Sequence, residues 1–258
     1  MSDPVAILRR VSRLAGTHVE FVSQMNSISN SAWRIQFANE PAVLRQHTLS
    51  FGPPVTDHER ELRIHALVAE HGLAPDILFA DAASGVLITR FESAGAFSRD
   101  AIDAQTIPEI AASLRALHSI AVPEGLEGYS LSAAADRYWH RAGAPQDAEL
   151  LACVSLVHEN EALSEAEAPV LCHRDVLHSN LLASNPVQFI DFEFASPGER
   201  WFDLAAFARW HQFDAVLTNT LLEVYLQAQP SERERASFDR ACRSFDALCT
   251  LWSLPAIT

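Results

Sequence analysis

The sequence predicts an α+β protein, with strands concentrated in residues 1–91 and helices in most of the remainder. Three observations indicate this class. Several early segments alternate apolar and polar residues between polar turns, which is typical of antiparallel strands. After residue 107, apolar residues recur every three to four positions, which is typical of amphipathic helices. Two short apolar segments between residues 170 and 194 interrupt the helices and are predicted to be strands.

The first segments predict a small sheet. Strands are expected at residues 19–22, 32–37 and 42–46, separated by polar turns at 26–31 and 39–41. This order of strand, loop, strand, turn and strand is one that can lay a loop over nucleotide phosphates.

A helix is predicted from Thr56 to His71, with Thr56 or Asp57 as its N-cap and Gly72 after its last turn. A strand hairpin then ends the first lobe, at residues 77–80 and 85–91. We therefore predict two lobes, an N-terminal one of residues 1–91 and a C-terminal one of residues 92–258.

The C-terminal lobe is expected to be mainly helical. Ile107, Ile110, Leu114 and Leu117 lie on one helical stripe, which predicts a buried face. Helices are predicted at residues 107–119, 132–141, 147–163, 203–208, 216–227 and 231–252.

Composition excludes several classes of protein. The net charge of −14 argues against nucleic acid and anionic membranes as partners and is compatible with a cationic substrate. No apolar run approaches the roughly 20 residues that span a bilayer. The first residues, Met-Ser-Asp-Pro, lack the pattern of a signal peptide, so a cytoplasmic protein is expected. The four cysteines lack metal-binding spacing, and Cys172 is expected to be a buried apolar residue rather than a nucleophile.

Three oxygen-bearing side chains recur near the two short apolar segments. Asp175 and Asn180 lie five residues apart, and Asp191 lies eleven residues beyond Asn180. In phosphoryl transfer, one carboxylate orients a hydroxyl and receives its proton, while an amide oxygen and a second carboxylate hold Mg²⁺ against nucleotide phosphates. We therefore predict Asp175 as the catalytic base and Asn180 and Asp191 as the metal ligands. A buried strand aspartate without a positive partner would be costly, which favours the metal role of Asp191.

The full pattern resembles a known group of enzymes. Three segments carry this pattern: His173-Arg174-Asp175 with Asn180, Asp191-Phe192-Glu193, and Gly198 to Ala205. They are similar to the motifs of kinase-like small-molecule phosphotransferases, which include choline/ethanolamine kinases, thiamine kinases and aminoglycoside phosphotransferases. The resemblance implies a protein-kinase-like two-lobe fold with a small antiparallel-sheet N-lobe, a mainly helical C-lobe, and ATP with Mg²⁺ in a cleft between them. It also implies that Asp203 bonds back to the catalytic loop and that His173 supports it. The alternative for Asp203 is a helix N-cap.

The chain contains no lysine, so the phosphate anchor that kinases place on an early strand must be an arginine or be absent. The resemblance supports Arg45, whose guanidinium can grip two phosphate oxygens or a carboxylate. Its expected partner is Glu61, with Glu59 as the rival.

The loop before the second strand contains no glycine, unlike the phosphate-binding loop of protein kinases. The resemblance assigns phosphate contacts there to Ser29, Asn30 and Ser31.

The acceptor is expected to be a small cation of the choline, ethanolamine or thiamine type. Such a cation is bound by aromatic faces and carboxylates, for which Trp201 and Glu193 are candidates alongside Tyr138, Trp139, Trp210 and Trp252. An aminoglycoside would need several carboxylates near the C-terminus, yet residues 247–258 are nearly uncharged. The other alternative is a nucleotide-binding module with little catalysis, which the glycine-free loop and missing lysine suggest. A protein kinase is disfavoured because the chain lacks an Ala-Pro-Glu element.

Overall fold

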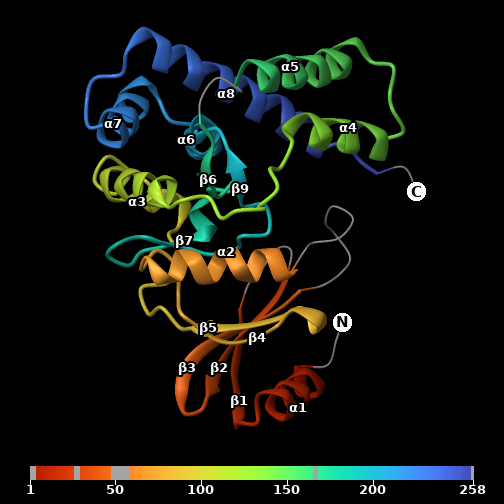
Figure 1. Cartoon of the computed structure of the whole chain (residues 1–258), viewed down its shortest axis with the longest axis vertical. Helices are drawn as coiled ribbons and strands as arrows, with labels where there is room; N and C mark the ends of the chain where they lie inside the picture. The colour runs from red at the N-terminus through yellow and green to blue at the C-terminus, as the bar shows by residue number, and fades with distance from the viewer. Residues whose placement is uncertain (1–3, 26–29, 48–57, 165–167, 257–258) are drawn as a thin grey trace. The chain divides into compact units, whose positions relative to one another are not determined.

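The structure is a computed structural model, and it describes residues 4–25, 30–47, 58–164 and 168–256 (Figure 1). The chain divides into two compact units. The first comprises Met1–Gly95 and Leu182–Glu193, and the second comprises Ala96–Leu181 and Phe194–Thr258. The first is built on an antiparallel sheet and the second is mainly helical, so the predicted fold class is confirmed.

The first unit contains a five-stranded antiparallel sheet with the order β1-β2-β3-β5-β4. Its strands are β1 (Val19–Met25), β2 (Asn30–Phe37), β3 (Glu40–His47), β4 (Ile77–Asp81) and β5 (Val86–Arg90). Every strand predicted in residues 1–91 is present.

Two helices cover opposite faces of this sheet (Figure 1). Helix α1 (Pro4–Ala15) packs Leu8 and Val11 into a cluster that also contains Trp33, Ile35, Ala42, Leu44, Val86 and Ile88. These sheet positions alternate along each strand, so they share one face. Helix α2 (His58–Glu70) lies on the other face, where Arg45 of β3 reaches Glu61. The predicted cap of α2 at Thr56 or Asp57 lies outside the described residues.

The segment Leu182–Glu193 groups with the first unit, which differs from the predicted division at residue 91. Strand β7 (Leu181–Leu182) pairs with β8 (Gln188–Phe189). The backbone N–H of Ala183 donates to Gly95 at 2.8 Å, and that of Phe189 donates to Leu73 at 2.7 Å. These long-range backbone bonds tie the segment to the sheet unit, and sequence proximity could not indicate them.

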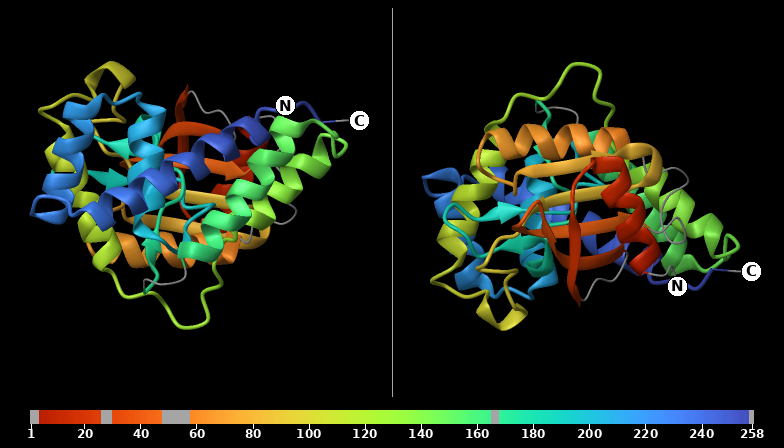
Figure 2. Two further views of the ribbon diagram at one scale, coloured as in Figure 1. Left: turned by 90° about the horizontal axis from the view of Figure 1, so that it is seen from above. Right: turned by 90° about the horizontal axis from the view of Figure 1, so that it is seen from below.

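The second unit contains six α-helices among its described residues and a two-stranded ribbon of β6 (Val170–Cys172) with β9 (Ser196–Gly198). The helices are α3 (Ile107–Ser119), α4 (Leu131–Arg141), α5 (Ala148–Ser164), α6 (Arg200–Trp210), α7 (Ala215–Leu226) and α8 (Glu232–Trp252). Helices α4 and α5 pack against each other and against α8, which also packs on α6 (Figure 2).

The predicted helices of this unit are all present. The stripe of α3 from Ile107 to Leu117 is buried, as its periodicity predicted. Ser231 caps α8 in a capping box with Glu234, which fixes the start of that helix. Helix α6 begins at Arg200, three residues before the predicted start. Among the described residues, no helix combines the length and apolarity needed to cross a bilayer.

Candidate active site

The loop that contains Asp175 directly follows β6 in the second unit. His173 is completely buried, and its Nδ1 lies 3.3 Å from the backbone nitrogen of Asp175. Arg174 adopts a left-handed conformation with φ of 70°. The loop then turns, with the N–H of Leu177 donating to the carbonyl of Asp175 at 2.9 Å. Asp175 therefore lies in the loop that follows the buried strand β6 and not on the strand itself.

Asp175 and Asn180 contact each other. The Nδ2 of Asn180 donates to Oδ2 of Asp175 at 2.7 Å and to its backbone carbonyl at 3.0 Å. Asn180 is 8% exposed, at the end of a short 3-10 turn. Because the amide nitrogen is engaged with Asp175, the amide oxygen is the group that Asn180 can offer to a cation.

Asp203 holds the backbone of this loop. It is the fourth residue of α6 and fully buried. Its Oδ2 accepts from the N–H of His173 at 2.7 Å, and its Oδ1 accepts from the N–H of Arg174 at 2.8 Å. The helix instead takes Glu199 as its N-cap. This is the geometry that the resemblance implied, and it excludes the N-cap alternative.

His118 of α3 supplies a further contact to Asp203. Its Nε2 lies 3.0 Å from Oδ2 of Asp203, and its Nδ1 lies 2.8 Å from the hydroxyl of Tyr225 on α7. Burial acts to raise the pKa of Asp203, but the hydrogen bond and charge of His118, with the charges of His173 and Arg174, outweigh it and lower that pKa. Sequence reasoning missed His118 and Tyr225, since nothing local marks either residue.

The ligand atoms of His118, Cys172 and Asp203 lie within 4.8 Å of one another, which raises the question of a metal site. Both carboxylate oxygens of Asp203 already accept hydrogen bonds from the chain. Burial raises the pKa of the Cys172 thiol well above its ordinary value, so the thiolate that would bind a metal is disfavoured. These residues fit a hydrogen-bonded core, and Cys172 is buried as predicted.

Asp191 belongs to the first unit, where it follows β8 in a turn with φ of 68°. Its Oδ1 accepts a hydrogen bond from Nη1 of Arg45. The sequence argument that Asp191 is a strand aspartate without a positive partner is therefore wrong. Arg45, which lies 146 residues earlier in the chain, supplies that partner.

Arg45 also donates from Nη2 to Oε1 of Glu61. The structure thus shows the expected pair and not its rival Glu59. The side chain of Glu61 is 4% exposed on the face of α2 that meets the sheet, whereas a residue two positions away on a helix points elsewhere. One guanidinium therefore bridges two carboxylates, using a different nitrogen for each.

The turn at Asp191 is supported from α2. The ring of Phe192 packs edge-on against His65, with ring centres 5.2 Å apart. The Nε2 of His65 lies 2.8 Å from the carbonyl of Pro75. Burial lowers the pKa of His65 to about 4, so the ring is neutral near pH 7 and donates from Nε2. His65 also escaped sequence reasoning, because its role depends on what packs against it.

The structure describes only part of the predicted phosphate loop. Ser29 lies outside the described residues. Asn30 and Ser31 are the first residues of β2, opposite His47 and Gln46, rather than part of a turn. They were predicted to lie in a turn because their side chains are small and polar, but pairing with β3 extends the strand over them.

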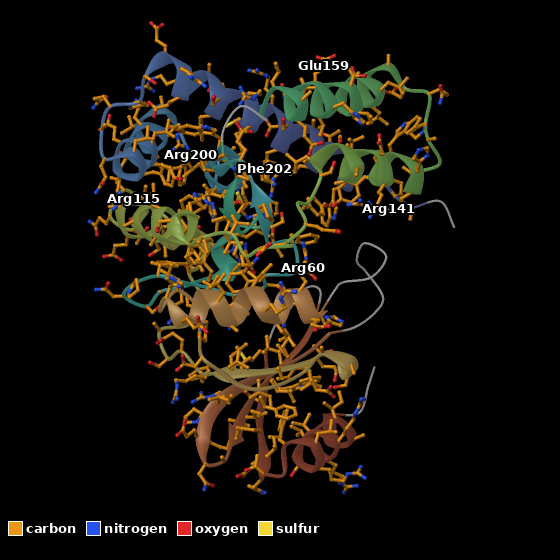
Figure 3. All side chains as sticks on the ribbon, in the orientation of Figure 1. Arg60, Arg115, Arg141, Glu159, Arg200 and Phe202 are labelled. Carbon is orange, nitrogen blue, oxygen red and sulfur yellow. The ribbon has the colours of Figure 1, made fainter. Side chains whose placement is uncertain are left out.

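Glu193 and Trp201, the candidate contacts to the acceptor, have different surroundings. The backbone carbonyl of Glu193 accepts from Nη2 of Arg60 at 3.0 Å; Arg60 is marked in Figure 3. Trp201 is fully buried in α6, with the guanidinium of Arg200 4.6 Å from its ring centre. Trp201 is thus a core residue and offers no open aromatic face. Trp210 and Trp252 are the exposed tryptophans among the described residues.

Residues 22–238 match the model of the phosphotransferase enzyme family. No curated protein sequence matches the chain. Similar solved structures include a choline/ethanolamine kinase family protein from Mesorhizobium loti, at 21% identity and a TM-score of 0.76 over 96% of this chain and 83% of that one.

Two further structures share this fold. LicA, a choline kinase from Streptococcus pneumoniae, was solved with AMP and is 19% identical, with a TM-score of 0.75 over 98% of this chain and 90% of that one. The macrolide 2'-phosphotransferase MphH from Brachybacterium faecium is 16% identical, with a TM-score of 0.68 over 95% of this chain and 90% of that one.

Proposed function

This chain belongs to the phosphotransferase enzyme family, and we propose that it is an ATP-dependent kinase that phosphorylates a hydroxyl group of a small cationic acceptor. The observation that carries the proposal is the Asp175–Asn180 pair, bonded at 2.7 Å on a loop whose backbone Asp203 holds. This arrangement presents a carboxylate beside an amide oxygen, as phosphoryl transfer to an alcohol requires.

Asp175 is assigned as the base. Its carboxylate accepts a hydrogen bond from Asn180, which limits the orientations that it can adopt. In this role it orients the acceptor hydroxyl and receives its proton as the new O–P bond forms. The Asp203 contacts to the preceding backbone keep Asp175 in place without lying at the reacting atoms.

Asn180 and Asp191 are assigned as the metal ligands. Both offer hard oxygen atoms, the kind that Mg²⁺ prefers, and Mg²⁺ usually retains water at its other positions. Mg²⁺, when bound, would neutralise charge on the nucleotide phosphates. Arg45 contacts Asp191 and Glu61, and we assign it to the phosphates because its fork of donors suits phosphate oxygens. Ser29, Asn30 and Ser31 are proposed to contact the same phosphates.

The acceptor class rests on charge and on the similar structures. A net charge of −14 favours a cation over an anion, and two of the similar structures are named as kinases of choline or ethanolamine type. Glu193 stays a candidate contact to the acceptor, whereas buried Trp201 does not. An antibiotic acceptor is the second candidate, because a macrolide phosphotransferase shares the fold.

The test is ATP consumption with choline, ethanolamine, thiamine, an aminoglycoside and a macrolide in parallel. We expect turnover with one of the first three. With that acceptor, Asp175→Asn should lower kcat by about 10²–10⁴-fold. Asp136→Asn, a matched change at an exposed aspartate of the same unit, should leave kcat unchanged.

A separate measurement tests the metal ligands. Asp191→Asn should weaken the Mg²⁺-dependent part of ATP binding while leaving binding without Mg²⁺ nearly constant. Near-normal rates for Asp175→Asn would disprove the base assignment. ATP binding without turnover on any acceptor would favour the alternative of a nucleotide-binding module.

A further inference from the structure

The sheet unit contains a groove between helix α1 and strand β1, which lie side by side (Figure 1). The groove has a volume of about 750 Å³. Its lining comes from one face of the helix and from the start of the strand: Leu8, Arg9, Ser12, Arg13, His18, Val19, Glu20 and Phe21. All of these residues lie in the first unit, and none belongs to the candidate active site.

The groove follows an open edge of the sheet. Among the described residues, β1 pairs with β2 alone, so it is the last strand on its side. Successive side chains of a strand point to opposite faces, so Val19 and Phe21 share one face and Glu20 lies on the other. Because residues of both faces line the groove, it runs along the edge of the strand and not over one face of the sheet. A strand edge presents backbone N–H and C=O groups with which another chain can pair.

Apolar side chains remain exposed beside this edge. Five of the seven residues of β1 are exposed, and they include Phe21 at 46% and Val22 at 43%. Leu14, next to the groove residue Arg13 on α1, is 51% exposed. Exposed apolar side chains that gather on an edge strand are typical of an interaction site. They favour a partner that brings apolar groups to the edge.

The helix beside the groove is positively charged, although the net charge of the chain is −14. Helix α1 carries Arg9, Arg10 and Arg13 and no acidic residue. Within the part of the chain that the structure describes, no carboxylate forms an ion pair with these arginines. Arg9 and Arg13 lie four residues apart, so they share a face of the helix, and both line the groove. At physiological salt, charges more than about 8 Å away are largely screened, so the groove itself favours an acidic partner.

Two other occupants fit the groove less well. If the same edge of a second copy paired with it, the arginines of the two copies would face each other. The register of β1 also shifts between Phe21 and Ser23, and such a bulge disfavours long pairing between edges. An anionic membrane could attract the arginines, but lipids have no peptide groups with which to continue the sheet. A short peptide segment needs only Val19–Phe21, which precede the bulge.

We propose that this groove binds a short extended segment of another protein in which acidic and apolar residues alternate. The segment adds a strand beside Val19–Phe21, which is a known mode of peptide recognition. Its apolar side chains cover Phe21, while its carboxylates pair with Arg9 and Arg13. The inference concerns the first unit alone and does not depend on the proposed phosphotransferase activity.

Titration of the ¹⁵N-labelled full chain with a defined peptide tests the proposal. The probe is a heptapeptide of alternating glutamate and valine with blocked ends. It should bind and shift the backbone amide signals of residues 8–13 and 18–22. Two control peptides should bind at least about tenfold more weakly. One carries lysine in place of glutamate and has the wrong charge; the other is N-methylated at every amide and lacks the donors for strand pairing.

Substitutions assign the binding to the groove. Arg13→Glu should weaken binding of the glutamate peptide about five- to tenfold. Phe21→Ala should also weaken it, because apolar contact is lost. Arg63→Glu is the matched control, since it changes the net charge equally at an exposed position of α2, on the opposite face of the sheet, and it should leave the affinity unchanged. The unfolding temperature of each variant is measured, so that affinities are compared only between folded proteins.

Several results would overturn the proposal. No binding at about 1 mM peptide, or equal binding of the glutamate and lysine peptides, would exclude an acidic segment. Amide shifts confined to other residues would exclude the groove. Self-association of the wild type that Phe21→Ala abolishes would assign the groove to a second copy. Sedimentation with phosphatidylglycerol vesicles, without peptide binding, would assign it to a membrane surface.

Discussion

His65 makes the stability of the first unit depend on pH, and the change His65→Gln should remove that dependence. The ring is 2% exposed and donates from Nε2 to the carbonyl of Pro75. Burial, aided by the positive charge of Arg45 and opposed by the bond to Pro75, lowers the pKa of His65 from 6.5 to about 4. Glutamine is always neutral and keeps a donor in the position of Nε2.

The sign and size of the effect follow from the two pKa values. The unfolded chain binds a proton near pH 6.5, but the folded protein binds it only near pH 4, so protonation favours unfolding. The contribution of His65 to the free energy of unfolding is fully present above pH 6.5 and is lost as the pH falls toward 4. Between pH 7.5 and 4.5 the loss should be about 2.5 kcal/mol, at about 1.4 kcal/mol per unit of pKa difference.

Urea unfolding at several pH values measures this loss. Wild type and His65→Gln are compared at each pH, so that other titrating groups cancel in the difference. The wild type should lose about 2.5 kcal/mol relative to the variant between pH 7.5 and 4.5. His71→Gln, at an exposed position just after the same helix, serves as the control and should follow the wild type. A difference between wild type and His65→Gln that stays constant within about 0.5 kcal/mol would refute the reasoning.

Two further substitutions test contacts of the candidate site. Arg45→Ala removes the arginine that pairs with the buried carboxylate of Glu61, so the free energy of unfolding measured in urea should fall by about 3–5 kcal/mol. Arg45→Lys should be intermediate, because an ammonium cannot bridge two carboxylates in the same way. Equal stability of Arg45→Ala and wild type would contradict this. Gly198→Ala would place a Cβ 1.8 Å from Nη2 of Arg174, so the guanidinium must move. The melting temperature should fall by an amount equivalent to about 1–2 kcal/mol. An unchanged melting temperature would show that the arginine moves at no cost.

Much of the fold could be predicted because its signals are local. The strands around Trp33 and Leu44 alternate with period two, and the stripe of α3 repeats every three to four residues. The predicted ends of the strands and helices were less accurate. Strand β1, for example, continues to Met25 because β2 supplies backbone partners that far. Helix α1 was missed although Pro4 suits a first helical turn and Leu8 and Val11 share a face.

In the candidate site, too, the contacts between residues close in sequence could be predicted and those between distant residues could not. The contact between Asp175 and Asn180 spans five residues, so its spacing was visible in the sequence. His118 lies 85 residues from Asp203, and Arg45 lies 146 residues from Asp191. Such pairs depend on how distant elements pack, and no local pattern encodes them. The incorrect argument about Asp191 followed from this, because its cation is remote in sequence.

The two loops that carry the proposed chemistry share a physical feature. Arg174 and Asp191 both adopt left-handed backbone conformations, with φ of 70° and 68°, which cost an L-residue roughly 1–2 kcal/mol. Each loop is bound by an ionised side chain from a distant element: Asp203 accepts from the N–H of Arg174, and Arg45 donates to the carboxylate of Asp191. A charge-assisted hydrogen bond contributes an amount similar to the backbone strain. We therefore infer that the charged side chains of Asp203 and Arg45 hold the two loops in their left-handed conformations. Removing either side chain should release the loop that it holds.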